Sequence, residues 1–386
     1  KDLPLARHAG VDFGQHLKDY VERTGLALHP LYGAKLRLIR DPRRVDYRWQ
    51  TVDRFRAELQ DRLNRLAKKL AQLRDHLDRL PDAGFPFARE TRREITYLAE
   101  RAEAQARLFN EILLVQDGRW VYWLEVEEYA LDGRPPFVDW ALKKAPLRVG
   151  PHLQHKIYDR NLPIIFTSAT LTTAERRFEF FADRLGLEHI VAPDRFHKID
   201  SEFPYEQRAF LVLADYLEAA PRGEDLARFK PVLTQELAYL LRLAGGRSLC
   251  LFTARERMEY AFHGSEQDGI EGLEAAMGRW SIPVFCQERN QSRKALKEEF
   301  STRVESVLLG LKSFWEGIDV PGKSLTFVVM EKLPFPMMGE PLIQARAEQY
   351  LTATSLDRFT PYILPLMLIH FKQGFGRLIR RHDDYG

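Results

Sequence analysis

From residue 161 onward, short apolar runs alternate with longer amphipathic stretches. Strands that alternate with helices predict a parallel sheet, because parallel strands need a crossover connection that a helix provides. Such strands are buried on both faces, which explains consecutive apolar residues. This part of the chain is therefore predicted to be an α/β domain with a parallel sheet flanked by helices. The expected strands lie at about 163–166, 209–213, 247–252, 282–286, 304–311 and 325–330, and the expected helices include 228–244, 291–300 and 340–353.

The first part of the chain carries a different pattern. Between residues 55 and 80, Phe55 and then leucines recur every three or four residues, which is typical of a heptad seam with charged flanks. A second helix is expected at about 88–115, so the two predict an antiparallel hairpin with a solvated charged surface. A shorter helix is expected within residues 1–45, and one short strand is expected after the hairpin. The helix is expected because Phe13, Leu17 and Val21 would share one face. The strand is expected from Trp120, Tyr122 and Trp123.

Residues 370–381 read His-Phe-Lys-Gln-Gly-Phe-Gly-Arg-Leu-Ile-Arg-Arg. Gln373, Arg377 and Arg380 would lie within an arc of roughly 60° if one helix continued through them. Their guanidinium forks suit a polyphosphate. The alternative is that these arginines only complement the negative end of a helix.

Three segments occur in a fixed order: Thr-Ser-Ala-Thr-Leu at 167–171, Ser-Phe-Trp-Glu-Gly-Ile-Asp-Val-Pro-Gly at 313–322, and Gln-Gly-Phe-Gly-Arg-Leu-Ile-Arg-Arg at 373–381. Together they resemble motifs III, V and VI of superfamily 2 helicases. The resemblance is to the DinG branch of these helicases, which is related to XPD. The Leu-Pro-Phe-Pro stretch at 333–336 fits the same branch. The resemblance is strong from about residue 146 to the end and only architectural for about 45–145.

The resemblance implies a domain organisation. Residues 1–45 would be a remnant of a first RecA-like domain, and 46–145 a helical arch-like insertion, beneath which single-stranded DNA passes in relatives. Residues 146–200, with motif III, would end the first RecA-like domain, and 205–386 would form the second, with motifs IV to VI. The family also normally continues into another strand beyond 384–386.

The resemblance assigns roles at an ATP site. Arg377 and Arg380 would act as arginine fingers toward the γ-phosphate, and Gln373 would orient water or phosphate. Ser168 and Thr170 would couple hydrolysis to DNA movement, or else they only cap the next helix. The residues implied to line the nucleotide cleft are Glu316, Gly317, Asp319 and Gly376, of which Asp319 could equally be a turn residue.

Four further residues fit contacts to a phosphate backbone. Thr253 and Arg255 follow one expected strand, and Lys312 and Ser313 precede motif V. Such contacts position a nucleic-acid strand without reading its sequence. The neighbouring Phe314 and Trp315 either stack on bases or pack in the core, which is the commoner fate of aromatic residues beside a buried strand.

Two motifs of the first RecA-like domain, the Walker A lysine and the DEAH box, are not in this sequence. A Walker A lysine and a DEAH box, with the ligands of Mg²⁺, are implied upstream of motif III, so the chain is predicted to be a piece of a helicase that alone hydrolyses no ATP. Residues 317–324 match G-x-x-x-x-G-K-S, but the apolar run at 325–330 predicts a strand where a P-loop opens a helix. Two cysteines are too few to hold an iron–sulfur cluster. If the protein has such a cluster, as many relatives do, its ligands precede Lys1.

The net charge of +3 excludes a global field that would attract nucleic acid, so a nucleic-acid site has to be a local groove. No signal peptide or membrane-spanning run is found, and no metal site, so a cytoplasmic protein is expected. The leading hypothesis is an ATP-dependent helicase that moves 5′ to 3′ on single-stranded DNA. The alternatives are a noncatalytic nucleic-acid-binding or effector-complex subunit with a helicase fold, and a small NTPase that uses residues 317–324 as a true P-loop.

Overall fold

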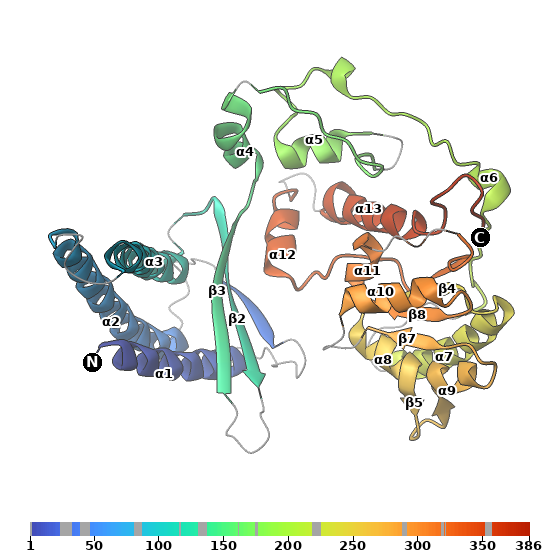
Figure 1. The fold of residues 1–386 in the computed structure, drawn as a ribbon, viewed down its shortest axis with the longest axis horizontal. Helices are drawn as coiled ribbons and strands as arrows, with labels where there is room; N and C mark the ends of the chain where they lie inside the picture. The colour runs from blue at the N-terminus through green and yellow to red at the C-terminus, as the bar shows by residue number, and fades with distance from the viewer. Residues whose placement is uncertain are drawn as a thin grey trace. The chain divides into compact units, whose positions relative to one another are not determined.

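The computed structural model of the chain contains two compact units, residues 1–149 with 337–352 and residues 150–336 with 353–386 (Figure 1). Each unit is described by itself. The structure describes residues 2–23, 33–38, 47–80, 87–115, 117–129, 137–160, 162–173, 177–217, 225–287, 292–317, 320, 322–351 and 357–386.

The second unit is built on a four-stranded parallel sheet in the order β7-β8-β4-β9. The predicted parallel sheet is thereby confirmed. Two predicted strands are wrong: 163–166 and 209–213 join no sheet in the described chain, and Phe210 is 89% exposed. An apolar run becomes a strand only where a neighbour pairs with it. The strands are β4 (Ser248–Leu251), β7 (Val284–Cys286), β8 (Val307–Gly310) and β9 (Phe327–Met330).

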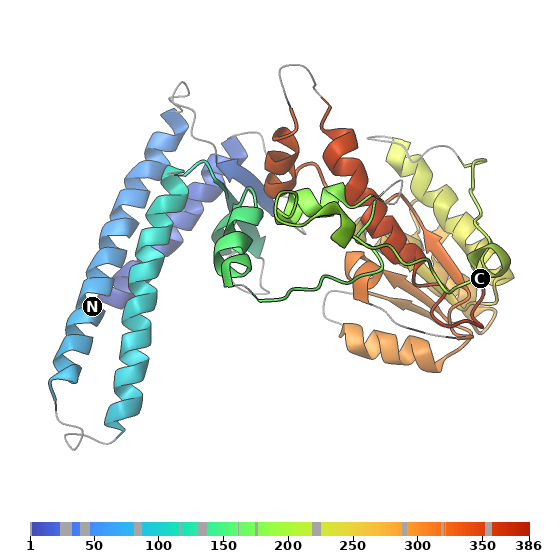
Figure 2. The same cartoon turned by 90° about the horizontal axis from the view of Figure 1, so that it is seen from above.

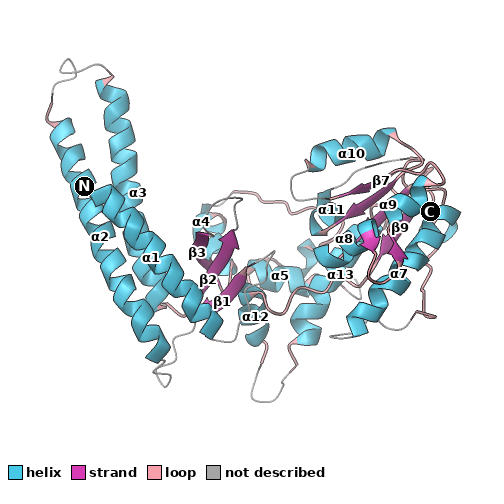
Figure 3. Cartoon of the chain, turned by 90° about the horizontal axis from the view of Figure 1, so that it is seen from below, coloured by secondary structure: helices cyan, strands magenta, loops and turns pink. Residues whose placement is uncertain are grey.

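Both faces of this sheet are covered by helices, as its apolar strands require (Figure 3). Leu249 and Leu251 pack with α10 (Arg293–Thr302) and α11 (Lys312–Gly317) on one face. Cys250 and Phe252 pack on the other face, because successive side chains of a strand alternate between faces. The helices of that second face are α7 (Asp225–Leu243), α8 (Arg255–His263) and α9 (Leu273–Gly278).

The helix that carries Gln373 is α13 (Leu364–Phe375), which follows the π-helical turn η5 (Phe359–Ile363). The prediction that one helix continues through Arg377 and Arg380 is wrong, because α13 ends at Phe375. Gly376 follows as its cap. Beyond it, the carboxylate of Asp384 accepts the backbone N–H of Arg380, at 2.8 Å. A side-chain acceptor thus takes the place of a helical carbonyl.

Gly374 lies where α13 packs on α11. A Cβ added there would come within 2.8 Å of Trp315 Cε3 and 2.9 Å of Met330 Cε. We therefore expect Gly374→Ala to lower the free energy of unfolding by about 1–3 kcal/mol through overpacking, although Ala favours a helix. Urea denaturation of the chain checks this. Gly278→Ala is the control, since nothing lies within 4 Å of its added Cβ; equal stability of the two variants would contradict the expectation.

The first unit contains the predicted hairpin of α2 (Tyr47–Asp78) and α3 (Ala88–Leu114), which lie side by side (Figure 2). It also contains a three-stranded antiparallel sheet, of which the sequence predicted only one short strand. Phe13, Leu17 and Val21 of α1 (Asp2–Arg23) are fully buried in the same core as residues of α3 and the sheet. Residues from the predicted segments 1–45 and 46–145 thus share one core. The strands are β1 (Ala34–Leu38), β2 (Trp120–Tyr129) and β3 (Phe137–Pro146).

Residues 337–352 also belong to the first unit, although the sequence analysis grouped them with the second RecA-like domain. Their helix α12 (Pro341–Glu348) is shorter than the predicted 340–353. Ion pairs join Lys35 to Glu340 at 2.7 Å and Arg37 to Glu348 at 2.6 Å. The remaining short elements are α4 (Gly150–Lys156), η2 (Tyr158–Arg160), α5 (Glu179–Leu185), η4 (Pro193–Arg195), α6 (Tyr205–Arg208), β5 (Gly264–Ser265) and β6 (Ile270–Glu271).

Candidate nucleotide and nucleic-acid site

The carboxyl ends of the four parallel strands meet at one edge of the sheet, where open α/β sheets place their sites. A polar side chain follows each strand there. Gln287, after β7, uses its amide to hold the loop after β8: its Nε2 donates to Ser313 Oγ at 3.0 Å, and its Oε1 accepts from Leu311 N at 2.9 Å. These bonds fix two loops of the edge together.

Glu331, directly after β9, is the buried charge of this edge, with only 1% of its side chain exposed. It accepts from Thr253 N at 3.2 Å and Thr253 Oγ1 at 3.1 Å. Arg257 Nε also donates to it, and Arg257 Nη2 donates to Thr253 Oγ1 at 2.7 Å. Both donors of Thr253 therefore point at Glu331, and the predicted phosphate contact of Thr253 would require this network to open.

The other predicted phosphate contacts gather around Gln287. Arg255, at the start of α8, is only 12% exposed and donates through Nη1 to Gln287 O at 3.0 Å and Glu259 Oε1 at 3.4 Å. Lys312, the first residue of α11, is exposed beside Ser313. Arg255 and Ser313 are thus brought together although 58 positions separate them in the sequence (313 − 255).

Phe314 and Trp315 are 3% and 2% exposed and pack in a core cluster, which confirms core packing over base stacking. Glu316 and Gly317 lie within α11, but their side chains are outside the described part of the structure, as is all of Asp319.

The segment after α13 lies against α11. Arg377 Nε donates to Trp315 O at 2.8 Å and Gln373 O at 3.1 Å. Gln373 Oε1 is buried and accepts no hydrogen bond from any described residue. A buried amide oxygen without a donor is rare and calls for an explanation such as an absent ligand or water. Gly376, another predicted nucleotide contact, caps α13 through its N–H to Lys372 O at 2.9 Å.

Asp384 organises the same segment. Its buried carboxylate accepts from Gly322 N at 3.1 Å, Arg380 N at 2.8 Å and Arg381 N at 2.7 Å. It therefore fixes the half-buried Arg380 to the loop that precedes β9. Asp384, Gln287 and Glu331 were not among the residues predicted for the site. For the last two, a polar residue directly after an apolar strand was the available signal.

Comparisons with known proteins identify relatives of the chain. Residues 237–386 match the family described as the helicase C-terminal domain. The chain is 33% identical over 272 residues to the ATP-dependent helicase DinG of Mycobacterium tuberculosis (strain H37Rv), covering 70% of the chain and 37% of that protein. It is 32% identical over 251 residues to the ATP-dependent DNA helicase YoaA of Escherichia coli K12, covering 64% of the chain and 35% of that protein.

The chain belongs to the DinG-like helicase family. A further relative is the 3′-5′ exonuclease DinG of Bacillus subtilis, which is 30% identical over 251 residues, or 64% of the chain and 25% of that protein. The chain spans about a third of the length of the first two relatives.

In this DinG-like chain, the two residues that follow the Thr-Ser-Ala-Thr-Leu segment contact α13. Lys372 Nζ donates to Thr172 O at 2.9 Å and Thr173 O at 3.1 Å. Burial, and then the charge of Lys198, lower the pKa of the Lys372 ammonium. Ser168 Oγ and Thr170 Oγ1 lie 3.3 Å apart, and residues 171–173, which follow them directly, are not helical. The capping alternative for Ser168 and Thr170 is therefore wrong.

The P-loop alternative also lacks its geometry in the DinG-like chain. Ser324 is buried and donates to Ser301 O at 3.2 Å, and β9 rather than a helix follows it. Within the described ranges, no cluster of His, Cys, Asp or Glu could hold a metal ion. No helix among those residues has the length and apolarity to cross a membrane.

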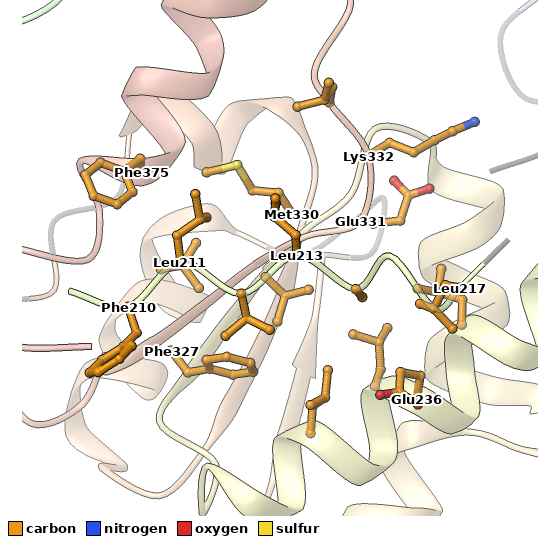
Figure 4. Close-up of a pocket in the computed structure, with 18 of the residues that line it drawn as sticks. Phe210, Leu211, Leu213, Leu217, Glu236, Phe327, Met330, Glu331, Lys332 and Phe375 are labelled. Atoms are coloured by element: carbon orange, nitrogen blue, oxygen red, sulfur yellow. The ribbon is translucent and has the colours of Figure 1, made fainter. Parts of the chain in front are cut away.

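The DinG-like chain also has an apolar cavity of about 450 Å³ beside β9 (Figure 4). Phe210, Leu211, Phe327 and Met330 are among the side chains that line it. Its charged wall residues are Glu236, Glu331 and Lys332, of which Glu331 accepts from Arg257 and Glu236 accepts from Tyr216. The rest of the lining is almost entirely apolar. The cavity therefore suits apolar packing, such as a further strand beside β9 would provide, rather than a triphosphate.

Proposed function

We propose that the chain is part of an ATP-dependent helicase that translocates on single-stranded DNA, in the 5′ to 3′ direction by family likeness. The observation that carries this proposal is the contact of Arg377 Nε with Trp315 O, which joins the motif V and motif VI segments at one surface. The names of the DinG and YoaA relatives, which are ATP-dependent helicases, support it.

At the proposed site, Arg377 and Arg380 bring positive charge to the γ-phosphate when two RecA-like domains close. Phosphoryl transfer to water needs position and charge stabilisation more than covalent work by the protein. The buried amide oxygen of Gln373 would accept a hydrogen from the attacking water. A Walker A lysine, the DEAH carboxylates and the ligands of Mg²⁺ would come from a preceding RecA-like domain, as the resemblance implies. Glu316, Gly317, Asp319 and Gly376 would line the cleft.

Ser168 and Thr170 would couple ATP hydrolysis at this site to movement of the DNA. The tether from Lys372 to the carbonyls of Thr172 and Thr173 offers a physical route, because Lys372 precedes Gln373 on α13. On the nucleic-acid side, Arg255, Lys312 and Ser313 would contact backbone phosphates, together with Thr253 if its bond to Glu331 opens. Phosphate contacts suit a translocase, since they ignore base sequence.

The alternative is a noncatalytic nucleic-acid-binding or effector subunit that keeps the fold for assembly. Such a subunit would bind single-stranded DNA but would hydrolyse no ATP even when joined to its preceding domain. Steady-state ATP hydrolysis by the longer polypeptide, with and without oligo-dT, separates the two. DNA-stimulated turnover supports the helicase.

Alone, the 386-residue chain is expected to hydrolyse no ATP, because the phosphate cradle is supplied elsewhere. Phosphate release by the purified chain, measured with and without oligo-dT, checks this. Lys323→Ala is expected to leave the baseline unchanged, since the lysine is exposed and precedes a strand. Turnover by the chain that disappears in Lys323→Ala would contradict the proposal and revive the P-loop alternative.

A further inference from the structure

Gln287 is bonded through every polar group it has. Its N–H donates to Leu309 O at 3.1 Å, and its Oε1 accepts from Leu311 N at 2.9 Å. Its Nε2 donates to Ser313 Oγ at 3.0 Å, and its carbonyl accepts from Arg255 Nη1 at 3.0 Å. One neutral residue therefore links the end of β7 to the start of α8 and to the loop that leads into α11.

The direction of the Gln287 amide follows from these partners. A backbone N–H can only donate, so the oxygen of the amide must face Leu311 and its nitrogen must face Ser313. The hydroxyl of Ser313 consequently accepts this bond and keeps its own proton for another acceptor. None of the described residues takes that proton. A phosphate oxygen is an acceptor of the required kind.

Two cationic residues are tied to this hydroxyl: Lys312 precedes Ser313 in the chain, and Arg255 shares Gln287 with it as a partner. Lys312 is exposed, and Arg255 spends only Nη1 on its two described contacts, which leaves its other guanidinium N–H groups for an anion. Thr253 cannot share the task in this arrangement, because both its donors point at Glu331. Donors to a phosphate backbone at this edge are thus Arg255, Lys312 and Ser313.

We propose that Gln287 is a positioning residue that holds Arg255 and the Lys312–Ser313 segment in one register for consecutive phosphates of single-stranded DNA. The proposal rests on the proposed DNA-binding function. It adds that the affinity for single-stranded DNA depends on a neutral residue that need not touch the DNA. Replacing Gln287 would move Arg255 and the Lys312–Ser313 segment out of this register. The chain would then make fewer phosphate contacts, although no charged residue has been removed.

The test measures binding of the 386-residue chain to a fluorescent 20-nucleotide oligo-dT over a range of salt concentrations. For single strands, the slope of log K against log salt changes by about 0.7 for each phosphate contact. Gln287→Leu, which keeps the volume and the charge, is expected to weaken binding about tenfold and to reduce the slope by about 0.7–1.4, or one to two contacts. Thermal unfolding is expected to remain cooperative, with a lower midpoint because Leu311 N loses its acceptor.

Gln287→Glu is the second variant, with a distinct expectation. A carboxylate still accepts from Leu311 N, but it forces the Ser313 hydroxyl to donate inward, so binding should fall below that of Gln287→Leu. Combining Gln287→Glu with Ser313→Ala should then add little to the loss. Gln267→Leu, at an exposed turn of the same unit, is the matched control and should bind like the wild type.

Two results would overturn the inference in different ways. A folded Gln287→Leu chain with wild-type affinity and slope refutes the positioning role and leaves the DNA-binding function intact. A wild-type chain that does not bind oligo-dT refutes the DNA-binding function and the inference with it. If Gln287→Leu does not fold, Gln287→Glu decides, and a folded Gln287→Glu chain that binds like the wild type refutes the role.

Discussion

Replacing Arg377 by Ala should lower ATP turnover by on the order of 10³-fold or more in a polypeptide that joins this chain to the domain with the Walker A lysine. A guanidinium that neutralises charge on the transferred phosphoryl group is worth about 10³–10⁵ in rate in related nucleotidases. The position of Arg377 is set by its Nε bonds to Trp315 O and Gln373 O. Arg377→Lys keeps a charge but loses the planar fork, so it should restore little activity.

The control for this prediction lies four residues away. Arg381→Ala removes the same charge from an exposed side chain and should leave turnover within about twofold of wild type, because an exposed charge contributes little energetically. Affinity for oligo-dT should be nearly unchanged in the Arg377 variants. Parallel loss of DNA binding and hydrolysis would indicate a folding or DNA-binding role for Arg377 instead.

Replacing Glu331 by Ala should lower the free energy of unfolding of the second unit by about 3–5 kcal/mol. The carboxylate is 1% exposed, and its removal leaves Arg257, 10% exposed, without its buried counter-charge. Thr253 also loses the acceptor of two hydrogen bonds. Native-state hydrogen exchange of the β4 amides measures the effect within this unit.

The matched control is an exposed pair of the same chemistry. Glu271 and Arg279 lie 2.6 Å apart but are 42% and 63% exposed, so Glu271→Ala should cost less than about 1 kcal/mol. A double replacement, Glu331→Leu with Arg257→Met, should recover much of the loss, since it leaves no buried charge. If Glu331→Ala and Glu271→Ala lowered the free energy of unfolding equally, burial of the Glu331–Arg257 pair would add nothing to stability, which would contradict this prediction.

The parallel sheet could be predicted because the signal for it is local. Each of the four strands of this sheet, β4, β7, β8 and β9, lies in an apolar run long enough to be recognised, and burial on both faces makes alternation unnecessary. The α2–α3 hairpin was equally visible, because a heptad spacing persists through most of the 32-residue helix α2.

The antiparallel sheet of the first unit could not be predicted in the same way. Ala34 of β1 pairs with Val126 of β2, and the long hairpin lies between them in the sequence. Such pairing depends on contacts between residues far apart in the sequence, which a local sequence pattern does not predict. Strand β3 also mixes charged and apolar residues, as in Leu142-Lys143-Lys144, which weakens its signal.

The sequence suggested which residues could form the candidate site, but the geometry that it predicted for them was wrong at the end of α13. Helical spacing suggested that Gln373, Arg377 and Arg380 share one face, whereas the helix ends at Phe375. The reason is tertiary: the carboxylate of Asp384 accepts the N–H groups beyond the helix end. Helix propensity alone does not predict that the side chain of Asp384, four residues after Arg380, accepts the Arg380 N–H.

The most direct test of the account compares the affinity of the longer polypeptide for ADP with its affinity for ADP and aluminium fluoride, which resembles the transferring phosphoryl group. Arg377 and Arg380 are proposed to contact that group and not the diphosphate. The account predicts that Arg377→Ala and Arg380→Ala bind ADP as the wild type does but no longer form the tighter fluoride complex. Variants that still form it with wild-type affinity would contradict the central claim that these arginines complete the ATP site.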